Sequence, residues 1–414
     1  MTRRVVVTGL GAVSPIGQDM PTTWEQLLAG ESGVAPITSY DASAFKVKVA
    51  AEVKDFVPPA GIDAKALKHM DRNSQFGVAA ALEALADAGL SIKEEERERV
   101  GVIFGSGGGG MATTFRWYEA FRQRGPRRVS PFAMSNFIAD AASGHIAIQT
   151  GALGPNYSPT SACATGTNAV GDGFSTIKLG RADAVIVGGS EAVVLPFLHA
   201  CFEMMGVLAP ETEPPAAACR PFDLRRKGFV PGEGGCALIL EELGRAEARG
   251  AEIYAEVLGF GSSNDAHDMV ASDASARGLR NALWQALREA GVSGDRVGYV
   301  NTHGTATQLN DRVETRAIKE IFGPHAQEML VSSIKAATGH MMSASGALEC
   351  AVVALALKRG LIPPTLNYET YDPDCDIDCV PNEAREVQLE AAVSTSVGLG
   401  GHNAAVLLRR WNGA

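Results

Sequence analysis

The sequence predicts an α/β protein whose mostly parallel sheet is covered by helices. Short runs rich in Val and Ile, bounded by Gly, alternate along the chain with stretches of helical spacing. Alternating strand and helix patterns are typical of sheets with helices packed on their faces. The 46 glycines, set against only 6% aromatic residues, favour tight turns and closely packed backbones.

Two stretches of the chain repeat this alternation. In the first, the predicted strands and helices are residues 4–10, 72–88, 99–106, 167–179, 182–189 and 234–243. In the second, they are residues 252–263, 276–290, 295–304, 328–336, 344–357 and 391–410. Because no low-complexity linker separates the stretches, we expect two similar halves, residues 1–250 and 251–414, fused around a shared core.

Composition excludes several classes of function. The 37 basic residues against 47 acidic ones give a net charge of −10, which disfavours nucleic-acid binding. No stretch approaches the roughly 20 apolar residues of a membrane span. The N-terminal segment MTRRVVVTGLGAV has too short an apolar run for an export signal, so we interpret it as a strand. The seven scattered cysteines do not suggest a disulfide framework, and we expect a cytoplasmic protein.

Two motifs resemble binding sites without meeting their requirements. Gly105 to Gly110 has the spacing of a dinucleotide-binding loop, but the expected acidic residue about 20 positions further on is missing. The acidic run from Asp372 to Glu383 lacks the glycine of a calcium loop and contains prolines. Cys375 and Cys379 have no second ligand pair, so no metal site is predicted.

The segment GPNYSPTSACATGTNAVGDG, residues 154–173, carries the strongest chemical signal. A Gly- and Pro-rich approach leads to Cys163, and a helix of small residues follows at once. A thiol at a helix N-terminus is favoured as thiolate by the partial positive charge there, and the thiolate is the nucleophile. The sequence therefore predicts a nucleophilic cysteine at the start of a deeply packed helix.

Two histidines occur in comparable settings further along the chain. His303 follows a predicted strand in YVNTHGTATQLND, and His340 lies with Lys335 in SIKAATGHMMSASG. A cysteine with two neutral imidazoles suits a reaction in which the thiolate accepts an acyl group. The imidazoles then donate hydrogen bonds to an enolate oxygen formed on a second thioester. A cysteine hydrolase remains an alternative, but it would release free acid without consuming malonyl groups.

The whole chain resembles the β-ketoacyl-acyl carrier protein synthases (ketosynthases), in particular the type II elongating enzymes. The resemblance rests on five motifs in order: TSACATG, PFDLRRKGFVPGEGG, NTHGTATQLND, IKAATGH and GLGGHN. It implies a thiolase-type fold, five layers α-β-α-β-α built from two similar halves. It also implies that Cys163 accepts the acyl chain, while His303 and His340 promote malonyl decarboxylation.

The resemblance assigns further residues position by position. Lys335 and Glu349 match the ion pair that organises the site, beside acidic residues at Asp311 and Glu314. The backbone N–H groups of Cys163 and Leu399 would form the oxyanion hole. Thr305 and Thr307 match threonines that contact the pantetheine arm. No cofactor of its own is implied, because the phosphopantetheine arm belongs to the acyl carrier protein.

Three positions depart from the family pattern in the direction of a wider acyl tunnel. Leu399 stands where the gating loop has a Phe, Gly108 where a branched aliphatic residue is usual, and Ala133 where a larger aromatic is common. These changes predict either an ordinary fatty-acid elongating enzyme whose neighbouring side chains refill the space, or the ketosynthase subunit of a type II polyketide synthase acting on unsaturated or bulky chains.

The implied partner is the acyl carrier protein, which is acidic. An enzyme of net charge −10 must therefore gather positive charge near its tunnel mouth, and two clusters qualify. Lys65 and Lys68 form one of them, and Arg127 and Arg128 belong to the other. The family further implies a homodimer or, alternatively, a heterodimer with a chain-length-factor-like subunit. A non-catalytic subunit is disfavoured by the intact Cys-His-His set, and neither nucleic acid nor membrane is an expected partner.

Overall fold

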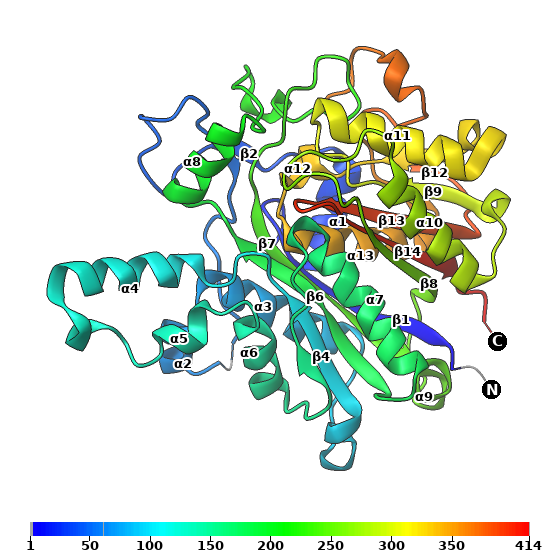
Figure 1. The fold of residues 1–414 in the computed structure, drawn as a ribbon. Coiled ribbons are helices and arrows are strands. Elements are labelled where there is room, and N and C mark those ends of the chain that lie inside the picture. The colour runs from blue at the N-terminus through cyan, green and yellow to red at the C-terminus, as the bar shows by residue number, and fades with distance from the viewer. Residues whose placement is uncertain (1–2, 61, 414) are drawn as a thin grey trace.

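A computed structural model describes residues 3–60 and 62–413, which are built around a sheet of ten strands (Figure 1). Across the sheet the strands are β10 (Leu330–Ser332), β9 (Val297–Asn301), β13 (Ala391–Gly398), β14 (His402–Arg410), β8 (Ala255–Asn264), β1 (Val5–Val13), β7 (Glu233–Glu242), β6 (Ala184–Ala192), β4 (Val100–Gly105) and β5 (Asn156–Tyr157). Two small sheets pair β2 (Val34–Pro36) with β3 (Val49–Ala51) and β11 (Leu361–Ile362) with β12 (Arg385–Glu386).

The sheet has the same pattern on either side of its middle. From β1 outward, β1 pairs with β7 and β7 with β6 in antiparallel fashion, and then β6 pairs with β4 and β4 with β5 in parallel fashion. From β8 outward, β8 pairs with β14 and β14 with β13 in antiparallel fashion, and then β13 pairs with β9 and β9 with β10 in parallel fashion. A short antiparallel pairing of β1 with β8 connects the two groups of five strands. The boundary at residues 250 and 251 falls between these groups and stays a prediction.

The expectation of a mostly parallel sheet is wrong. Four of the nine neighbouring pairs are parallel and five are antiparallel. One of the antiparallel pairs has a local reason in residues 391–410, where β13 turns directly into β14 and returns beside it. A tight hairpin forces antiparallel pairing, whereas the helical connections elsewhere permit parallel strands.

Two central helices lie between the two groups of strands (Figure 1). α7 (Thr165–Lys178) contacts α13 (Ser343–Arg359), and each contacts strands of both groups. The helices approach closely because they meet at glycines: a Cβ on Gly166 would lie 2.3 Å from the Ser343 carbonyl oxygen, and one on Gly346 would lie 2.4 Å from Thr167 Oγ1. Larger residues there would push the helices apart.

The outer layers are also helical. α3 (Arg72–Asp87) and α6 (Ala141–Thr150) cover the first group of strands, while α10 (Arg277–Ala290), with α11 (Gln308–Phe322) beside it, covers the second. Together with the central helices this gives the predicted order of helix, sheet, helix, sheet and helix. The remaining helices are α1 (Met20–Ala29), α2 (Ala64–His69), α4 (Met111–Arg124), α5 (Ala133–Phe137), α8 (Pro196–Met205), α9 (Leu243–Ala248) and α12 (Lys335–Thr338).

α4 projects away from the rest of the molecule, with α2 and α5 near its base (Figure 1). The His69 ring lies 4.3 Å from the Phe132 ring between centroids, which places α2 against the segment that leads into α5. Among the helices of residues 3–60 and 62–413, none combines the length and the apolar character needed to cross a membrane.

Candidate active site

Cys163 lies at the entrance to α7, in a short 3₁₀ turn over Ala162–Ala164. The preceding residue, Ala162, has φ of 50°, a left-handed conformation that alanine rarely adopts. This turn directs the thiol into a cavity of about 260 Å³, although Cys163 itself is only 7% exposed. Strained backbone of this kind is found where a reactive side chain must be held in a fixed direction.

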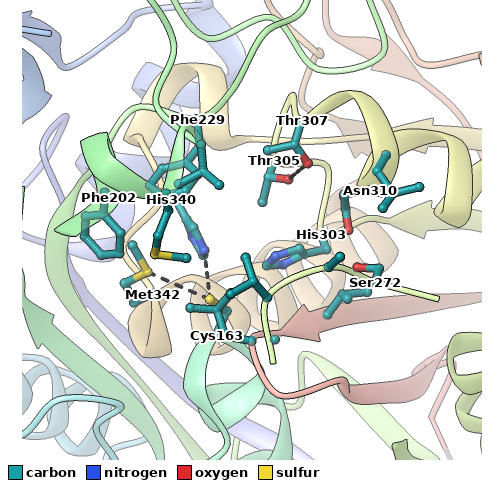
Figure 2. A pocket seen from close by; sticks show the side chains of 18 residues that line it. Cys163, Phe202, Phe229, Ser272, His303, Thr305, Thr307, Asn310, His340 and Met342 are labelled. Atoms are coloured by element: carbon teal, nitrogen blue, oxygen red, sulfur yellow. Dashed lines mark hydrogen bonds between the residues drawn. The ribbon is translucent and has the colours of Figure 1, made fainter. Parts of the chain in front are cut away.

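His340 lies beside the thiol, between α12 and α13 (Figure 2). Its Nε2 is 3.1 Å from Cys163 Sγ, while its Nδ1 is 3.3 Å from the hydroxyl of Ser345. That hydroxyl accepts a hydrogen bond from the Met341 N–H, so its own proton is free to reach Nδ1. The same hydroxyl has a second lone pair that can accept from Nδ1–H, so it can hold either ring tautomer of His340: Nε2 then faces Cys163 as an acceptor or carries a proton toward the cavity.

His303 completes the group from the end of β9. Its ring centroid is 5.1 Å from that of His340, with the two rings nearly perpendicular at 83°. The backbone N–H groups of His303 and Gly304 donate to the buried carboxylate of Glu314, which fixes this turn. One sulfur and one nitrogen from each ring lie within 4.8 Å of one another.

Burial determines the charge states of this group. It lowers the pKa of both His303 and His340 well below the usual range, and the charge of Lys335 acts in the same direction. Burial also raises the pKa of Cys163 to about 11, against the opposing effects of Lys335 and of the backbone N–H groups of Leu399 and Cys163. The free enzyme therefore holds a thiol and two neutral imidazoles at neutral pH.

The predicted thiolate at the helix N-terminus is thus not the resting state of Cys163. The sequence places the thiol correctly at the start of α7, but loss of solvation outweighs the favourable charges around it. A neutral imidazole 3.1 Å away can accept the thiol proton as the sulfur attacks.

Lys335 and Glu349 form an ion pair whose side chains are both completely buried. Burial raises the pKa of the Glu349 carboxyl, and the Lys335 charge offsets part of that rise. Lys335 starts α12 and Glu349 is on α13, so the pair connects the two helices on either side of His340. The Lys335 charge adds to the effect of burial, which is the larger cause, in lowering the pKa of both imidazoles.

The predicted oxyanion hole lies where β13 ends. A Cβ on Gly398 would come within 2.8 Å of the Ser161 carbonyl oxygen and 3.2 Å of the Cys163 nitrogen, so only glycine lets the strand end approach the nucleophile. The N–H groups of Leu399 and Cys163 both act on the sulfur and stabilise negative charge there. Two N–H donors at one point are the arrangement that tetrahedral intermediates require.

The cavity continues from Cys163 toward the protein surface. Thr305 and Thr307, the residues predicted to contact pantetheine, line it and have their hydroxyls 3.0 Å apart. Leu399 lines it as well and is 37% exposed. Apolar side chains make up the inner wall: Phe202, Met205, Val207, Phe229 and Met342. These apolar side chains, with the flexible methionines among them, suit contact with an acyl chain.

The other two residues assigned to the acyl pocket lie outside the cavity of this single chain. Gly108 is exposed in the loop between β4 and α4, and Ala133 is buried at the start of α5. Gly107, the neighbour of Gly108, lies near the turn that holds Cys163, because a Cβ on Gly107 would lie 3.7 Å from Ala162 Cα. Their role in holding the acyl chain stays a prediction.

The same glycine loop explains the apparent dinucleotide motif. The N–H groups of Gly107 and Gly108 donate to the buried carboxylate of Glu191, which also accepts from the hydroxyls of Ser106 and Ser343. The donors that would cradle a phosphate are already bound within the protein. Glu191 thereby joins this loop to Ser343 at the start of α13, the residue directly after the cavity-lining Met342. The sequence motifs gave no indication of this role.

Sequence reasoning also missed Arg226, which is 1% exposed. Its guanidinium pairs with Asp372 at 2.5 Å and Asp311 at 3.4 Å, and donates to the carbonyl oxygen of Gln308 at 3.1 Å. It thus fixes the start of α11, directly after Thr307. The only available signal was its position in PFDLRRKGFVPGEGG, since an arginine is rarely buried without a structural task.

The two basic clusters lie on α2 and on the turn between α4 and α5. Lys65 and Lys68 are exposed on α2, and Arg127 and Arg128 are exposed in the turn after α4. The contact of His69 with Phe132 places α2 beside the segment that leads from this turn into α5.

The chain is similar to known proteins over nearly its whole length. Residues 2–246 match the model of the beta-ketoacyl synthase N-terminal domain, and residues 254–369 match that of its C-terminal domain. The 3-oxoacyl-[acyl-carrier-protein] synthase 2 of Coxiella burnetii (strain RSA 493 / Nine Mile phase I) is 45% identical over 408 residues, which is 99% of each chain.

Solved structures agree with this assignment. The ishigamide ketosynthase/chain length factor superposes with a TM-score of 0.92 at 35% identity, covering 100% of both chains. The complex AntDE:AntF, a type II polyketide synthase acyl-carrier protein with its ketosynthase bound to the hexaketide, gives a TM-score of 0.90 at 32% identity, again over 100% of both chains. With a matching fold and both family domains present, the chain belongs to the beta-ketoacyl synthase family.

Proposed function

We propose that the protein is a β-ketoacyl-acyl carrier protein synthase that elongates fatty acyl chains by decarboxylative Claisen condensation. The observation that carries the proposal is the meeting of Cys163, His303 and His340 in one cavity, with reactive atoms within 4.8 Å. The likeness to 3-oxoacyl-[acyl-carrier-protein] synthase 2 supports fatty-acid elongation in particular.

In the first half-reaction, Cys163 Sγ attacks the thioester carbonyl of an acyl-carrier protein. The sulfur–carbon bond to the enzyme forms as the bond to the pantetheine sulfur breaks, and His340 Nε2 receives the thiol proton and returns it to the departing thiolate. The N–H groups of Cys163 and Leu399 stabilise the oxyanion between these events.

In the second half-reaction, malonyl-carrier protein enters along Thr305 and Thr307. The bond to its carboxylate breaks, carbon dioxide leaves, and the electron pair forms an enolate. His303 and His340 are neutral because their pKa values are lowered, and each can donate its ring N–H as a hydrogen bond to the enolate oxygen. The enolate carbon bonds to the acyl carbonyl carbon as the bond from that carbon to Cys163 Sγ breaks. The released thiolate takes up a proton from solvent, and the β-ketoacyl chain, two carbons longer, leaves on the carrier.

The test is a condensation assay with acyl-carrier and malonyl-carrier protein, read by mass spectrometry of the carrier. A β-ketoacyl product formed together with carbon dioxide supports the proposal. Release of free acid without consumption of malonyl groups would instead identify a cysteine hydrolase.

A second candidate is the ketosynthase of a type II polyketide synthase acting on unsaturated or bulky chains. It is supported by the likeness to two polyketide ketosynthase structures and by the small side chains at Gly108 and Leu399. The two functions differ in acyl specificity and not in chemistry, so both rest on the same three side chains.

Adding bulk at Gly108 tests the widened tunnel. A Cβ at this position would meet only Met111 Cγ at 3.3 Å and Glu191 Oε1 at 3.5 Å, so Gly108→Phe should fold. We expect it to shorten the longest chain that Cys163 accepts, measured by loading a graded series of acyl-carrier proteins. Gly144→Phe, at an open position on α6, is the matched control. An unchanged chain-length profile in Gly108→Phe would disprove the tunnel.

Carrier docking is proposed at the exposed basic residues of α2 and of the turn after α4. Lys65, Lys68, Arg127 and Arg128 are exposed there, on a chain of net charge −10, and an acidic carrier would be steered to them. The double variant Arg127→Glu/Arg128→Glu should raise KM for acyl-carrier protein about ten-fold and weaken its dependence on salt.

The control for this variant is Lys93→Glu/Arg288→Glu, which makes the same change of charge on exposed positions of other surfaces. It should leave KM unchanged. An equal effect of both double variants would show that net charge matters and that the location of docking is wrong.

Dimerisation is proposed through the open edge of the sheet at β5. Both of its residues are exposed, Tyr157 by 43%, and the apolar side chains of Ile148 on α6 and Leu153 just before β5 are 75% and 58% exposed. An unpaired edge with apolar neighbours favours pairing with a second chain. Sedimentation of the protein alone should give twice the mass of one chain. A protein that is a monomer alone and dimerises only with a related subunit would show that the dimer is a heterodimer.

A further inference from the structure

The active-site cavity also presents the donor set of a soft divalent cation. Cys163 Sγ and one ring nitrogen each of His303 and His340 lie within 4.8 Å of one another, and all three side chains are buried. Thiolate sulfur and imidazole nitrogen are the ligands that zinc prefers, and sites with three protein ligands keep a fourth position open. No other group of this kind occurs within residues 3–60 and 62–413.

The distances are close to those that zinc requires. Zn–S bonds of about 2.3 Å and Zn–N bonds of about 2.0–2.1 Å place tetrahedral ligands roughly 3.5 Å apart. Cys163 Sγ and His340 Nε2 are already 3.1 Å apart, so the ion needs a slight separation of this pair and a small approach of the His303 ring. The cavity of about 260 Å³ in front of them leaves room for the ion and a water ligand.

The surroundings hold these ligands in place. The Ser345 hydroxyl is 3.3 Å from Nδ1 of His340, and Glu314 fixes the backbone of the turn that carries His303. Such contacts from outside the ligand set orient ligands and raise affinity. The nearby cation Lys335 is paired with Glu349, so its repulsion of a metal ion is largely offset.

We propose that Zn²⁺, or a cation of the same class such as Cd²⁺, binds Cys163, His303 and His340 and inhibits the enzyme reversibly. A bond forms between the metal and Cys163 Sγ as the thiol proton passes to the buffer. No electrons are transferred. The bound ion occupies the nucleophile and both hydrogen-bond donors at once, so it competes with acyl loading. The inhibition rests on the proposed function, whereas the binding of the ion can be tested without it.

Cobalt(II) tests the site directly, because tetrahedral Co²⁺ bound to a thiolate has visible absorption bands and a sulfur-to-metal charge-transfer band. We expect one equivalent of Co²⁺ to produce both in the full-length protein, and Zn²⁺ to remove them by displacement. Cys163→Ser should lose the charge-transfer band. Wild-type protein alkylated at Cys163 with iodoacetamide should lose it too, which guards against misfolding of the variant. Cys201→Ser, which removes a partly exposed cysteine on α8, is the control and should behave as wild type.

Inhibition is measured in the condensation assay with Zn²⁺ added and then removed by a chelator. With free Zn²⁺ at about ten times its dissociation constant, mass action leaves about one tenth of the enzyme metal-free, so the rate should fall about ten-fold and recover with chelator. An unchanged rate, or a cobalt spectrum that survives alkylation, would overturn the proposal by showing adventitious binding. If cobalt binds as expected but no condensation occurs at all, the metal site stands and the proposed function fails.

Discussion

Replacing Cys163 with alanine should abolish condensation while carbon dioxide release from malonyl-carrier protein continues. The variant lacks the acyl acceptor, but His303 and His340 remain to stabilise the enolate. We expect the rate of β-ketoacyl formation to fall by about 10³-fold or more, the range observed when a nucleophile is removed. The enolate then takes up a proton in place of attacking an acyl group, giving acetyl-carrier protein.

The measurement follows carbon dioxide and carrier-bound products in parallel. The matched control is Cys201→Ala, which should change neither quantity because Cys201 lies outside the cavity. Persistent condensation in Cys163→Ala would contradict the assignment of the nucleophile. Loss of both activities would contradict the separate roles given to the cysteine and the histidines.

Replacing Lys335 with alanine should destabilise the protein more than any surface substitution. Lys335 and Glu349 are completely buried, so the variant leaves the Glu349 carboxyl without its partner. Removing one member of a buried ion pair costs about 3–5 kcal/mol of the free energy of unfolding. The double variant Lys335→Met/Glu349→Leu should recover much of that loss, because no charge remains buried, but it should lack activity.

Urea denaturation of the two variants measures this difference. Lys319→Ala is the control, since Lys319 and Asp376 form an ion pair that is 39% and 34% exposed. A pair so exposed is worth about 0–1 kcal/mol. If Lys335→Ala is no less stable than Lys319→Ala, the buried pair does not organise the site as described.

The sequence predicted the architecture well where a pattern had one structural solution. Val- and Ile-rich runs bounded by Gly became central strands, and the helical stretch 344–357 became α13, which is buried throughout that range. Strand direction was predicted wrongly, because hydrophobic runs do not reveal whether a strand such as β14 returns beside its neighbour. That information lies in the turn Gly400–Gly401, where both residues have positive φ.

The candidate site was foreseeable only in part. His303 and His340 each follow a strand in a turn rich in small residues, which suggested a shared site but not the 3.1 Å contact with Cys163. The raised pKa of Cys163 could not be foreseen, because burial depends on how α7 and α13 pack. Arg226 and Glu191 act through contacts with residues more than 80 positions away, which no local motif records.

Intact-protein mass spectrometry after mixing the enzyme with a panel of acyl-carrier proteins tests the central claim most directly. We expect the enzyme to gain the mass of the acyl group and the Cys163→Ala variant to gain none. Loading by saturated chains would indicate fatty-acid elongation, and selective loading by unsaturated or polyketide chains would indicate the second candidate. Acylation that persists in Cys163→Ala, or an enzyme that accepts no acyl group from any carrier, would contradict the account.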